Sequence, residues 1–325
     1  MKVSTSPEIR PDMQPDPAKV PFDLERTLSA VVSIHTEIPG DAFTAPTLGT
    51  ERRGHGVVIR DGGLILTIGY LIVEAASIWM VDITGRAIPG DALGYDQETG
   101  FGLVQALEPI ALPPMEIGRS GELSEGEPVI FAGAGGRAQA LNTQVVSIRE
   151  FAGYWEYLLN EAIFTTPPHP FWGGGALIGS DGTLRGIGSL FVQEAVPGQD
   201  SLDGNMVVPI DLLEPILDDL VSTGRTQGPG RPWLGMFTAE AVGKVVVAGL
   251  WNGGPAERAG VETGDLVLEV DGTPVTGMAD MLRHIWSLGE AGVEVPLIIF
   301  RDRSILEIRV PSASRSDYYK APKLH

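Results

Sequence analysis

The residues best suited to acid–base chemistry near neutral pH are five histidines: His35, His55, His169, His284 and His325. A histidine that contacts a hydroxyl group can activate it for nucleophilic attack. His169 comes closest to such an arrangement because Thr165 and Thr166 precede it, but this spacing forms no recognised nucleophile–base pattern. His55 lies between two glycines at a turn into a strand and could bond Glu51. His35 alternates with an apolar neighbour on an early strand, which favours a structural role.

Other kinds of site find little support in the sequence. The chain has no cysteine, which excludes disulfides, thiolate metal sites and cysteine nucleophiles. No two histidines have metal-ligand spacing, although a histidine–carboxylate site assembled from several loops stays open. The glycine-rich stretch 133–136 lacks the lysine of a phosphate-binding loop. We therefore expect no metal and no cofactor.

The net charge of the 325-residue chain bears on its partners. The formal charge is −19, of which −17 lies in residues 1–230. Such an acidic surface repels phosphate backbones and anionic lipids, so we expect neither nucleic acid nor membrane as a partner. No run of 18 apolar residues occurs, and residues 1–21 are polar and rich in proline without a signal-peptide core. We expect a cytoplasmic protein.

Short apolar runs separated by glycine, proline and Asp-Gly turns predict a mainly β protein. We divide the chain into a flexible extension over residues 1–21, a first domain over 22–225, a linker over 226–230, a second domain over 231–311 and a polar tail over 312–325. A helix is predicted over 211–222, with Asp211 as its N-cap and an end near Gly224. The second domain is expected to contain strands at 245–247, 266–270 and 295–300 and a helix near 278–288.

The second domain resembles the PDZ domains that follow the protease domain in HtrA/Deg proteins. Residues 254–272 (GPAERAGVETGDLVLEVDG) carry most of the resemblance, and residues 232–236 (PWLGM) resemble that family's carboxylate-binding loop. Consecutive N–H groups of such a loop converge on an anion, while the peptide adds a strand to the adjoining sheet edge. The predicted peptide-binding residues are Trp233, Leu234, Gly235, Met236, Met281, Leu282 and Ile285. The alternative is that these side chains form the core of a module whose groove is closed.

The first domain resembles the chymotrypsin-like protease domain of the same family, a double β-barrel. The matching segments include 54–59 (GHGVVI), 64–67 (LILT), 126–129 (GEPV) and 174–178 (GGALI), in the family's order. With the PDZ domain, the resemblance covers about nine-tenths of the chain. It also implies a possible homotrimer formed through N-terminal aromatic residues, for which Phe22 is the candidate.

The sequence departs from the family at the three catalytic positions. The segment 66–72 (LTIGYLI) places Tyr70 where the family has its histidine, and the segment 94–101 (GYDQETGF) places Gly100 at the aspartate position. The segment 169–177 (HPFWGGGAL) places Gly173 at the serine position. Tyrosine is too weak a base at neutral pH, and glycine offers neither a hydroxyl nor a carboxylate. We therefore predict a pseudoprotease with no enzymatic activity.

The leading hypothesis is a protein-binding role, as a scaffold, assembly factor or accessory subunit of an enzyme complex. The PDZ groove and the altered cleft, where Phe171 and Trp172 expose large apolar groups, are the predicted contact surfaces. Two alternatives stay open: a serine endopeptidase or other hydrolase with a rearranged active site, and a chaperone-like holder of unfolded chains. A basic patch on a protein partner would match the acidic first domain.

Overall fold

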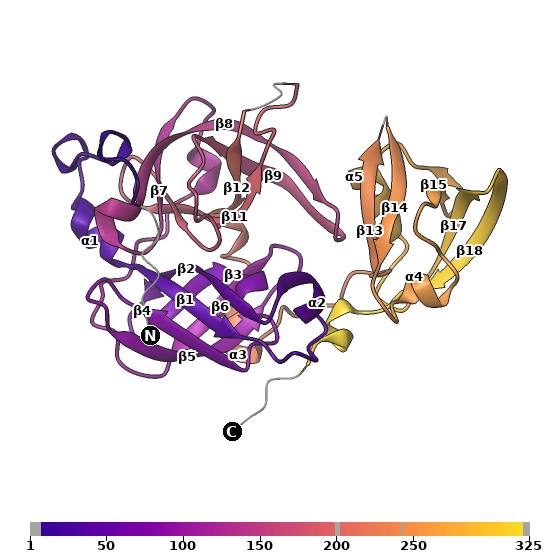
Figure 1. The fold of residues 1–325 in the computed structure, drawn as a ribbon, viewed down its shortest axis with the longest axis horizontal. Coiled ribbons are helices and arrows are strands. Elements are labelled where there is room, and N and C mark those ends of the chain that lie inside the picture. The colour runs from indigo at the N-terminus through magenta and orange to yellow at the C-terminus, as the bar shows by residue number, and fades with distance from the viewer. Residues whose placement is uncertain (1–7, 199–201, 242, 321–325) are drawn as a thin grey trace. The chain divides into compact units, whose positions relative to one another are not determined.

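A computed structural model of the chain describes residues 8–198, 202–241 and 243–320, which divide into two compact units. The first unit lies within residues 1–149, 161–226 and 320–325, and the second lies within residues 150–160 and 227–319. Strands dominate both units (Figure 1), and the predicted mainly β class is confirmed.

Two closed barrels make up most of the first unit. The first barrel has the strand order β1-β2-β3-β6-β5-β4 and consists of β1 (Val31–Glu37), β2 (Glu51–Arg60), β3 (Leu64–Ile68), β4 (Ser77–Val81), β5 (Ala87–Tyr95) and β6 (Phe101–Ala106). The second barrel has the order β10-β11-β12-β9-β8-β7 and consists of β7 (Pro128–Ala132), β8 (Ala140–Gly153), β9 (Tyr157–Thr166), β10 (Ala176–Ile178), β11 (Leu184–Val192) and β12 (Gly204–Pro209). The apolar residues of β3 are buried at every position, and Phe131, Leu177 and Val207 meet in the core of the second barrel.

The second unit is built on a six-stranded antiparallel sheet. Its order is β13-β14-β15-β17-β18, with β16 paired to β15, and its strands are β13 (Met236–Ala241), β14 (Lys244–Leu250), β15 (Leu266–Val270), β16 (Thr273–Pro274), β17 (Glu294–Arg301) and β18 (Ser304–Pro311). Two helices belong to this unit, α4 (Pro255–Arg258) and α5 (Met278–Ser287). The three predicted strands and the predicted helix of this part of the chain are present.

The helices of the first unit are short. They are α1 (Leu24–Ser29), α2 (Ala45–Leu48) and α3 (Leu217–Thr223). Seven 3-10 helices are also described, at Pro11–Met13, Pro17–Lys19, Gly69–Leu71, Ser120–Glu122, Gly136–Gln139, Ile210–Leu212 and Arg315–Tyr318. Asp23 caps α1 by accepting a hydrogen bond from the Arg26 N–H at 3.0 Å.

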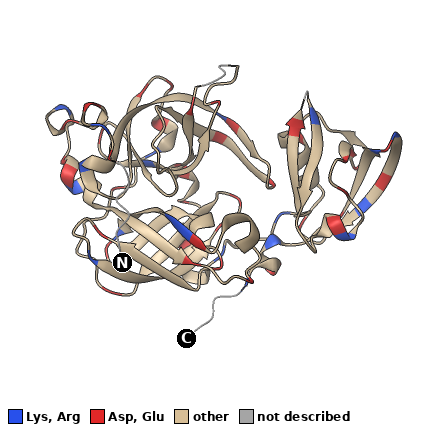
Figure 2. Cartoon of the chain, viewed as in Figure 1, with Lys and Arg blue, Asp and Glu red and all other residues tan. Residues whose placement is uncertain are grey.

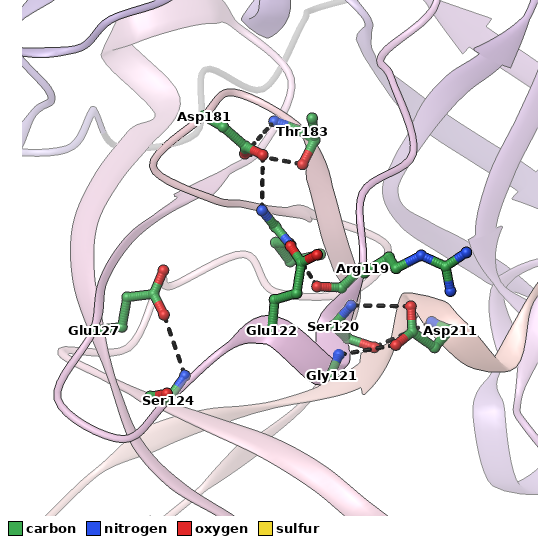
Figure 3. A network of polar contacts seen from close by, with 10 residues as sticks. Arg119, Ser120, Gly121, Glu122, Ser124, Glu127, Asp181, Thr183 and Asp211 are labelled. Carbon is green, nitrogen blue, oxygen red and sulfur yellow. Dashed lines mark hydrogen bonds and ion pairs between the residues drawn. The ribbon is translucent and has the colours of Figure 1, made fainter.

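The predicted helix over 211–222 is wrong in its first half. The segment Ile210–Leu212 forms a 3-10 helix and α3 begins at Leu217, because Pro215 disfavours helical geometry at the residue before it. Asp211 does not cap α3. Its carboxylate accepts hydrogen bonds from the N–H groups of Ser120 and Gly121, at 3.0 and 2.8 Å (Figure 3). The predicted end at Gly224 is confirmed, since this residue is the left-handed C-cap of α3.

The described part of the N-terminal segment is structured, against the expectation of a flexible extension. It contains two of the 3-10 helices, and Ile9 is buried with its N–H bonded to the Ala138 carbonyl at 2.9 Å. Part of the predicted polar tail is also structured, because Ala313 forms a β-bridge with Trp233. Residues 1–7 and 321–325 lie outside the described residues.

Acidic residues are spread over many separate strands and turns of both units (Figure 2). Among the described residues, no helix has the length and apolar character needed to cross a membrane. Phe22, the candidate for trimer contacts, packs within its own chain: a Cβ added to Gly182 would lie 2.5 Å from its Cγ.

Candidate functional site

The three positions expected to correspond to a catalytic triad lie in the first unit, and two of them, Tyr70 and Gly173, lie at the junction of its two barrels. Tyr70 lies on the 3-10 helix that follows β3, and Gly173 lies in the loop before β10. The barrels contact each other here, because the His55 N–H on β2 donates to the Gly173 carbonyl at 2.8 Å. The structure therefore brings Tyr70 and Gly173 together.

The hydroxyl of Tyr70 is held in a defined position. Its Oη donates a hydrogen bond to the Ser189 carbonyl on β11 at 2.9 Å. Burial raises the pKa of Tyr70 above its ordinary value of 10.0, so the phenol stays protonated at neutral pH. This group is a hydrogen-bond donor and has no basic character at neutral pH.

Gly173 leaves room for that hydroxyl. A Cβ at this position would lie 2.7 Å from Tyr70 Oη, which is closer than real Cβ contacts. A residue larger than glycine therefore needs the tyrosine to move. The tyrosine and the glycine are complementary in shape.

Gly100 lies at the end of the turn after β5. Its φ of +84° favours glycine, and its carbonyl accepts a hydrogen bond from the Gly69 N–H at 2.7 Å. The nearby carboxylate of Asp96 is used within the turn: it accepts from both the N–H and the hydroxyl of Thr99, each at 2.7 Å. It forms no bond to Tyr70 in the structure.

His55 and His169 lie close together in the first unit. Their ring centroids are 6.5 Å apart in an edge-on arrangement. His55 is buried on β2, where its Nδ1 accepts from the Ala134 N–H at 3.1 Å, while its Nε2 is buried without a partner. Burial and the proximity of His169 lower the pKa of His55 from 6.5 to about 3. It is a neutral structural histidine, and the suggested bond to Glu51 is not formed.

His169 is fully buried as well. Its ring stacks on Phe131 with centroids 5.3 Å apart, Nε2 bonds the Gln139 carbonyl at 3.1 Å, and Nδ1 accepts from the Phe171 N–H at 3.1 Å. Burial lowers the pKa of His169 below its ordinary value. Both ring nitrogens are therefore engaged with the backbone, and neither bonds a hydroxyl group.

The remaining candidate histidines lie elsewhere. His35 is half-buried on β1, and His284 on α5 faces Asp280 at 3.2 Å. His325 is outside the described residues. Among the residues that the structure describes, no three His, Asp or Glu side chains gather as a metal site would require.

Phe171 and Trp172 were predicted to expose large apolar groups, but both are half-buried. Trp172 packs against the core of the second barrel and tilts against Phe191, with ring centroids 5.7 Å apart. The surface that they offer to a partner is correspondingly smaller.

The predicted peptide-binding residues are brought together in the second unit. Most of their side chains form its core: Leu234, Met236, Met281, Leu282 and Ile285 are 0–1% exposed, and Trp233 is 4% exposed. The backbone of the loop is nevertheless shaped for an anion. Gly235 has a φ of +77°, and the N–H groups of Leu234, Gly235 and Met236 point at one carboxylate.

That carboxylate belongs to Glu156, which sequence reasoning missed. Glu156 is 7% exposed and comes from the turn between β8 and β9, within residues 150–160 of the second unit. Burial raises the pKa of Glu156, while the three N–H donors and Arg315 oppose this shift. The only signal in the sequence was an acidic residue among the aromatic residues of a turn, which is not specific.

Comparisons with known proteins agree with this arrangement. Residues 54–187 match the trypsin-like peptidase domain and residues 232–311 match the PDZ domain. The solved structure described as "HtrA-type protease AlgW with decapeptide" aligns with a TM-score of 0.53 at 20% identity, over 90% of this chain and 97% of that one. This likeness shows the fold. The chain has the fold of a trypsin-like peptidase domain followed by a PDZ domain.

The curated relatives that the chain matches carry protease names. It is 26% identical over 330 residues to the periplasmic pH-dependent serine endoprotease DegQ of Escherichia coli (strain K12), covering 92% of this chain and 71% of DegQ. It is also 26% identical over 270 residues to the serine protease PepD of Mycobacterium tuberculosis, covering 75% of this chain and 57% of PepD. A probable DegP-like periplasmic endoprotease of Hahella chejuensis is 23% identical, and the match spans 56% of its length.

These names contradict the expectation that the chain is not an enzyme. The matched relatives are named serine endoproteases, which points to protease activity. The residues at the three expected triad positions are Tyr70, Gly100 and Gly173.

Proposed function

We propose that this HtrA-type protein acts on polypeptides, as a serine endopeptidase or related hydrolase whose active site is rearranged. The observation that carries the proposal is the matched pair of domains, a trypsin-like peptidase domain over residues 54–187 and a PDZ domain over residues 232–311. The endoprotease names of DegQ and PepD support the hydrolytic part. The PDZ domain supports the recognition of peptide segments or chain ends.

The rearrangement follows from the residues at the junction of the barrels. Residues 169–179 contain no serine, threonine or cysteine, and the space beside Gly173 is taken by the Tyr70 hydroxyl. A hydrolytic reaction therefore needs a nucleophile from another part of the chain. Among the histidines, His169 is the one on the loop that leads to Gly173.

The test is hydrolysis of casein by the full chain, with labelling by a serine-reactive phosphonate. We expect the wild-type protein to hydrolyse casein and to be labelled by the phosphonate. Both casein hydrolysis and labelling should be lost in His169→Ala. His35→Ala is the matched control, and thermal unfolding of each variant shows that it is folded. Absence of cleavage and of labelling in folded wild-type protein would contradict the hydrolytic part.

A second candidate function is a binding role within a protein complex, as a scaffold, assembly factor or accessory subunit. One observation favours it: Tyr70 is hydrogen-bonded in place and fills the space where a side chain at position 173 would project. The test is affinity purification of the native protein followed by mass spectrometry. A small, constant set of partners supports this role, whereas a broad set of unfolded clients indicates chaperone-like holding.

Two further predictions accompany this function. Assembly into a homotrimer is tested by light scattering of the purified full chain, and a cytoplasmic location is tested by cell fractionation. The relatives DegQ and the DegP-like protein are named periplasmic. Recovery of this chain in the periplasmic fraction would contradict the predicted cytoplasmic location.

A further inference from the structure

The anion-binding loop of the PDZ domain is occupied by a side chain of the same chain. Glu156 Oε1 accepts hydrogen bonds from the N–H groups of Gly235 and Met236 at 2.7 and 2.8 Å. Its Oε2 accepts from the Leu234 N–H at 3.0 Å. Three consecutive backbone donors thus converge on one carboxylate, and hydrogen bonds to a charged acceptor are among the stronger ones in proteins.

The residues before Glu156 follow the sheet edge as a bound peptide would. β13 is an edge strand, and its Thr238 N–H donates to the Tyr154 carbonyl at 2.9 Å. Tyr154 precedes Glu156 by two residues while Thr238 follows Met236 by two, so the two segments run antiparallel. The ring of Tyr154 also packs against Phe237, with centroids 5.9 Å apart. This is the geometry of strand addition to a sheet edge.

Further contacts hold the same turn in place. Arg315 donates to the Trp155 carbonyl at 3.1 Å, and Arg283 on α5 bonds both Glu150 and Asn160 at the two ends of residues 150–160. Leu158 packs against the core of the second unit. The contact with the loop is therefore one part of a larger docked surface.

Glu156 adopts a backbone conformation that a side chain other than glycine rarely takes. Its φ is +62°, in the left-handed region. Such a conformation persists where surrounding contacts outweigh its cost, and it often marks a site of function. Here it directs the carboxylate into the loop.

We infer that residues 154–156 are an internal ligand of the PDZ domain, which a polypeptide with a free terminal carboxylate must displace in order to bind. This inference rests on the peptide recognition in the proposed function. The same three N–H donors cannot hold two carboxylates at once. A tethered ligand competes at a high effective concentration. Only the molecules whose loop is free of Glu156 can bind an external peptide, so the smaller their fraction, the weaker the apparent affinity.

The test is fluorescence anisotropy of the full chain with labelled ten-residue peptides that end in Val, Leu or Phe with a free carboxylate. Glu156→Ala is compared with the wild type, and Glu156→Gln is a second variant that keeps the size of the side chain. Glu161→Ala is the matched control, because this exposed glutamate lies on β9 outside residues 150–160. Peptides amidated at the C-terminus measure binding that does not depend on the carboxylate, and near-ultraviolet circular dichroism shows that each variant is folded.

We expect Glu156→Ala and Glu156→Gln to bind the free-carboxylate peptides at least about tenfold more tightly than the wild type and Glu161→Ala. The amidated peptides should show no such gain. Equal binding by wild type and variants would overturn the internal ligand and leave the proposed peptide recognition standing. If no peptide binds to folded Glu156 variants, the loop is not a site for chain ends, and both the inference and that part of the proposed function fail.

Discussion

The hydroxyl oxygen of Tyr70 lies 2.7 Å from the point where a Cβ on Gly173 would be placed. These two residues belong to different barrels and are complementary in shape, because the glycine leaves the space that the phenol fills. The Ser189 carbonyl fixes the hydroxyl there with a 2.9 Å hydrogen bond. A substitution at one position should therefore change the packing at the other.

Gly173→Ala should destabilise the protein by about 1–3 kcal/mol, the usual cost of forcing an extra methyl group into a packed site. The same change should cost less in a Tyr70→Phe background. Without the hydroxyl, the nearest atom of the ring lies 3.6 Å from the new Cβ, an ordinary contact distance. Urea unfolding of the two single variants and the double variant measures this coupling. Strictly additive free energies would show that the two residues do not share the space.

Stability should fall as the pH is lowered from about 6.5 towards 3. The pKa of His55 falls from 6.5 in the unfolded chain to about 3 in the folded one, so across this range only the unfolded chain takes up the proton. The contribution of neutral His55 to the free energy of unfolding is complete above pH 6.5. As the pH falls below this value, the contribution decreases by up to about 1.4 kcal/mol per pH unit. The lowered pKa of His169 acts in the same direction.

His55→Asn should flatten this dependence of unfolding free energy on pH. The amide oxygen of asparagine can still accept the Ala134 N–H, so packing is disturbed little. The measurement is urea unfolding at several values between pH 4 and 7, with His35→Asn as the control substitution. Parallel curves for His55→Asn and the wild type would contradict the account of a buried neutral imidazole.

Asp265 forms a buried part of a hydrogen-bonded ion pair in the second unit. It is 1% exposed and receives two hydrogen bonds of 2.6 Å from Arg301, with a third from the Glu262 N–H at 2.8 Å. Asp265→Asn should cost about 1.5–3 kcal/mol, because the buried side chain loses its charge-assisted hydrogen bonds to Arg301. Glu294→Gln is the matched control: its 3.0 Å pair with Arg309 is exposed, and its loss should cost much less, because water screens an exposed pair. Equal losses of unfolding free energy for both would refute this ranking.

The order of the domains and the meeting of Tyr70 with Gly173 could be predicted from the sequence. Both follow from patterns within short segments of the chain: short strands between turns, and motifs in the order that the family has them. The end of α3 at Gly224 is of the same kind, since a glycine that ends a helix is a local signal.

The start of α3 and the role of Glu156 could not be predicted in this way. Asp211 looks like a helix cap, but it serves the backbone of Ser120 and Gly121, which lie about 90 residues earlier. Glu156 binds Leu234 across 78 residues of chain. Partners at such separations are chosen by the tertiary fold, and the residues themselves carry no pattern that names them.

Amide hydrogen exchange at Leu234, Gly235 and Met236 tests the occupied loop most directly, because it reads the donors themselves in the full chain. Exchange protection reports whether an N–H is held in a hydrogen bond that must open before it exchanges. We predict that the three amides are protected in the wild type and exchange at least about tenfold faster in Glu156→Ala, while amides of the central strand β15 are unchanged. Fast exchange of the three amides in the wild-type protein, or equal protection in the variant, would contradict the account.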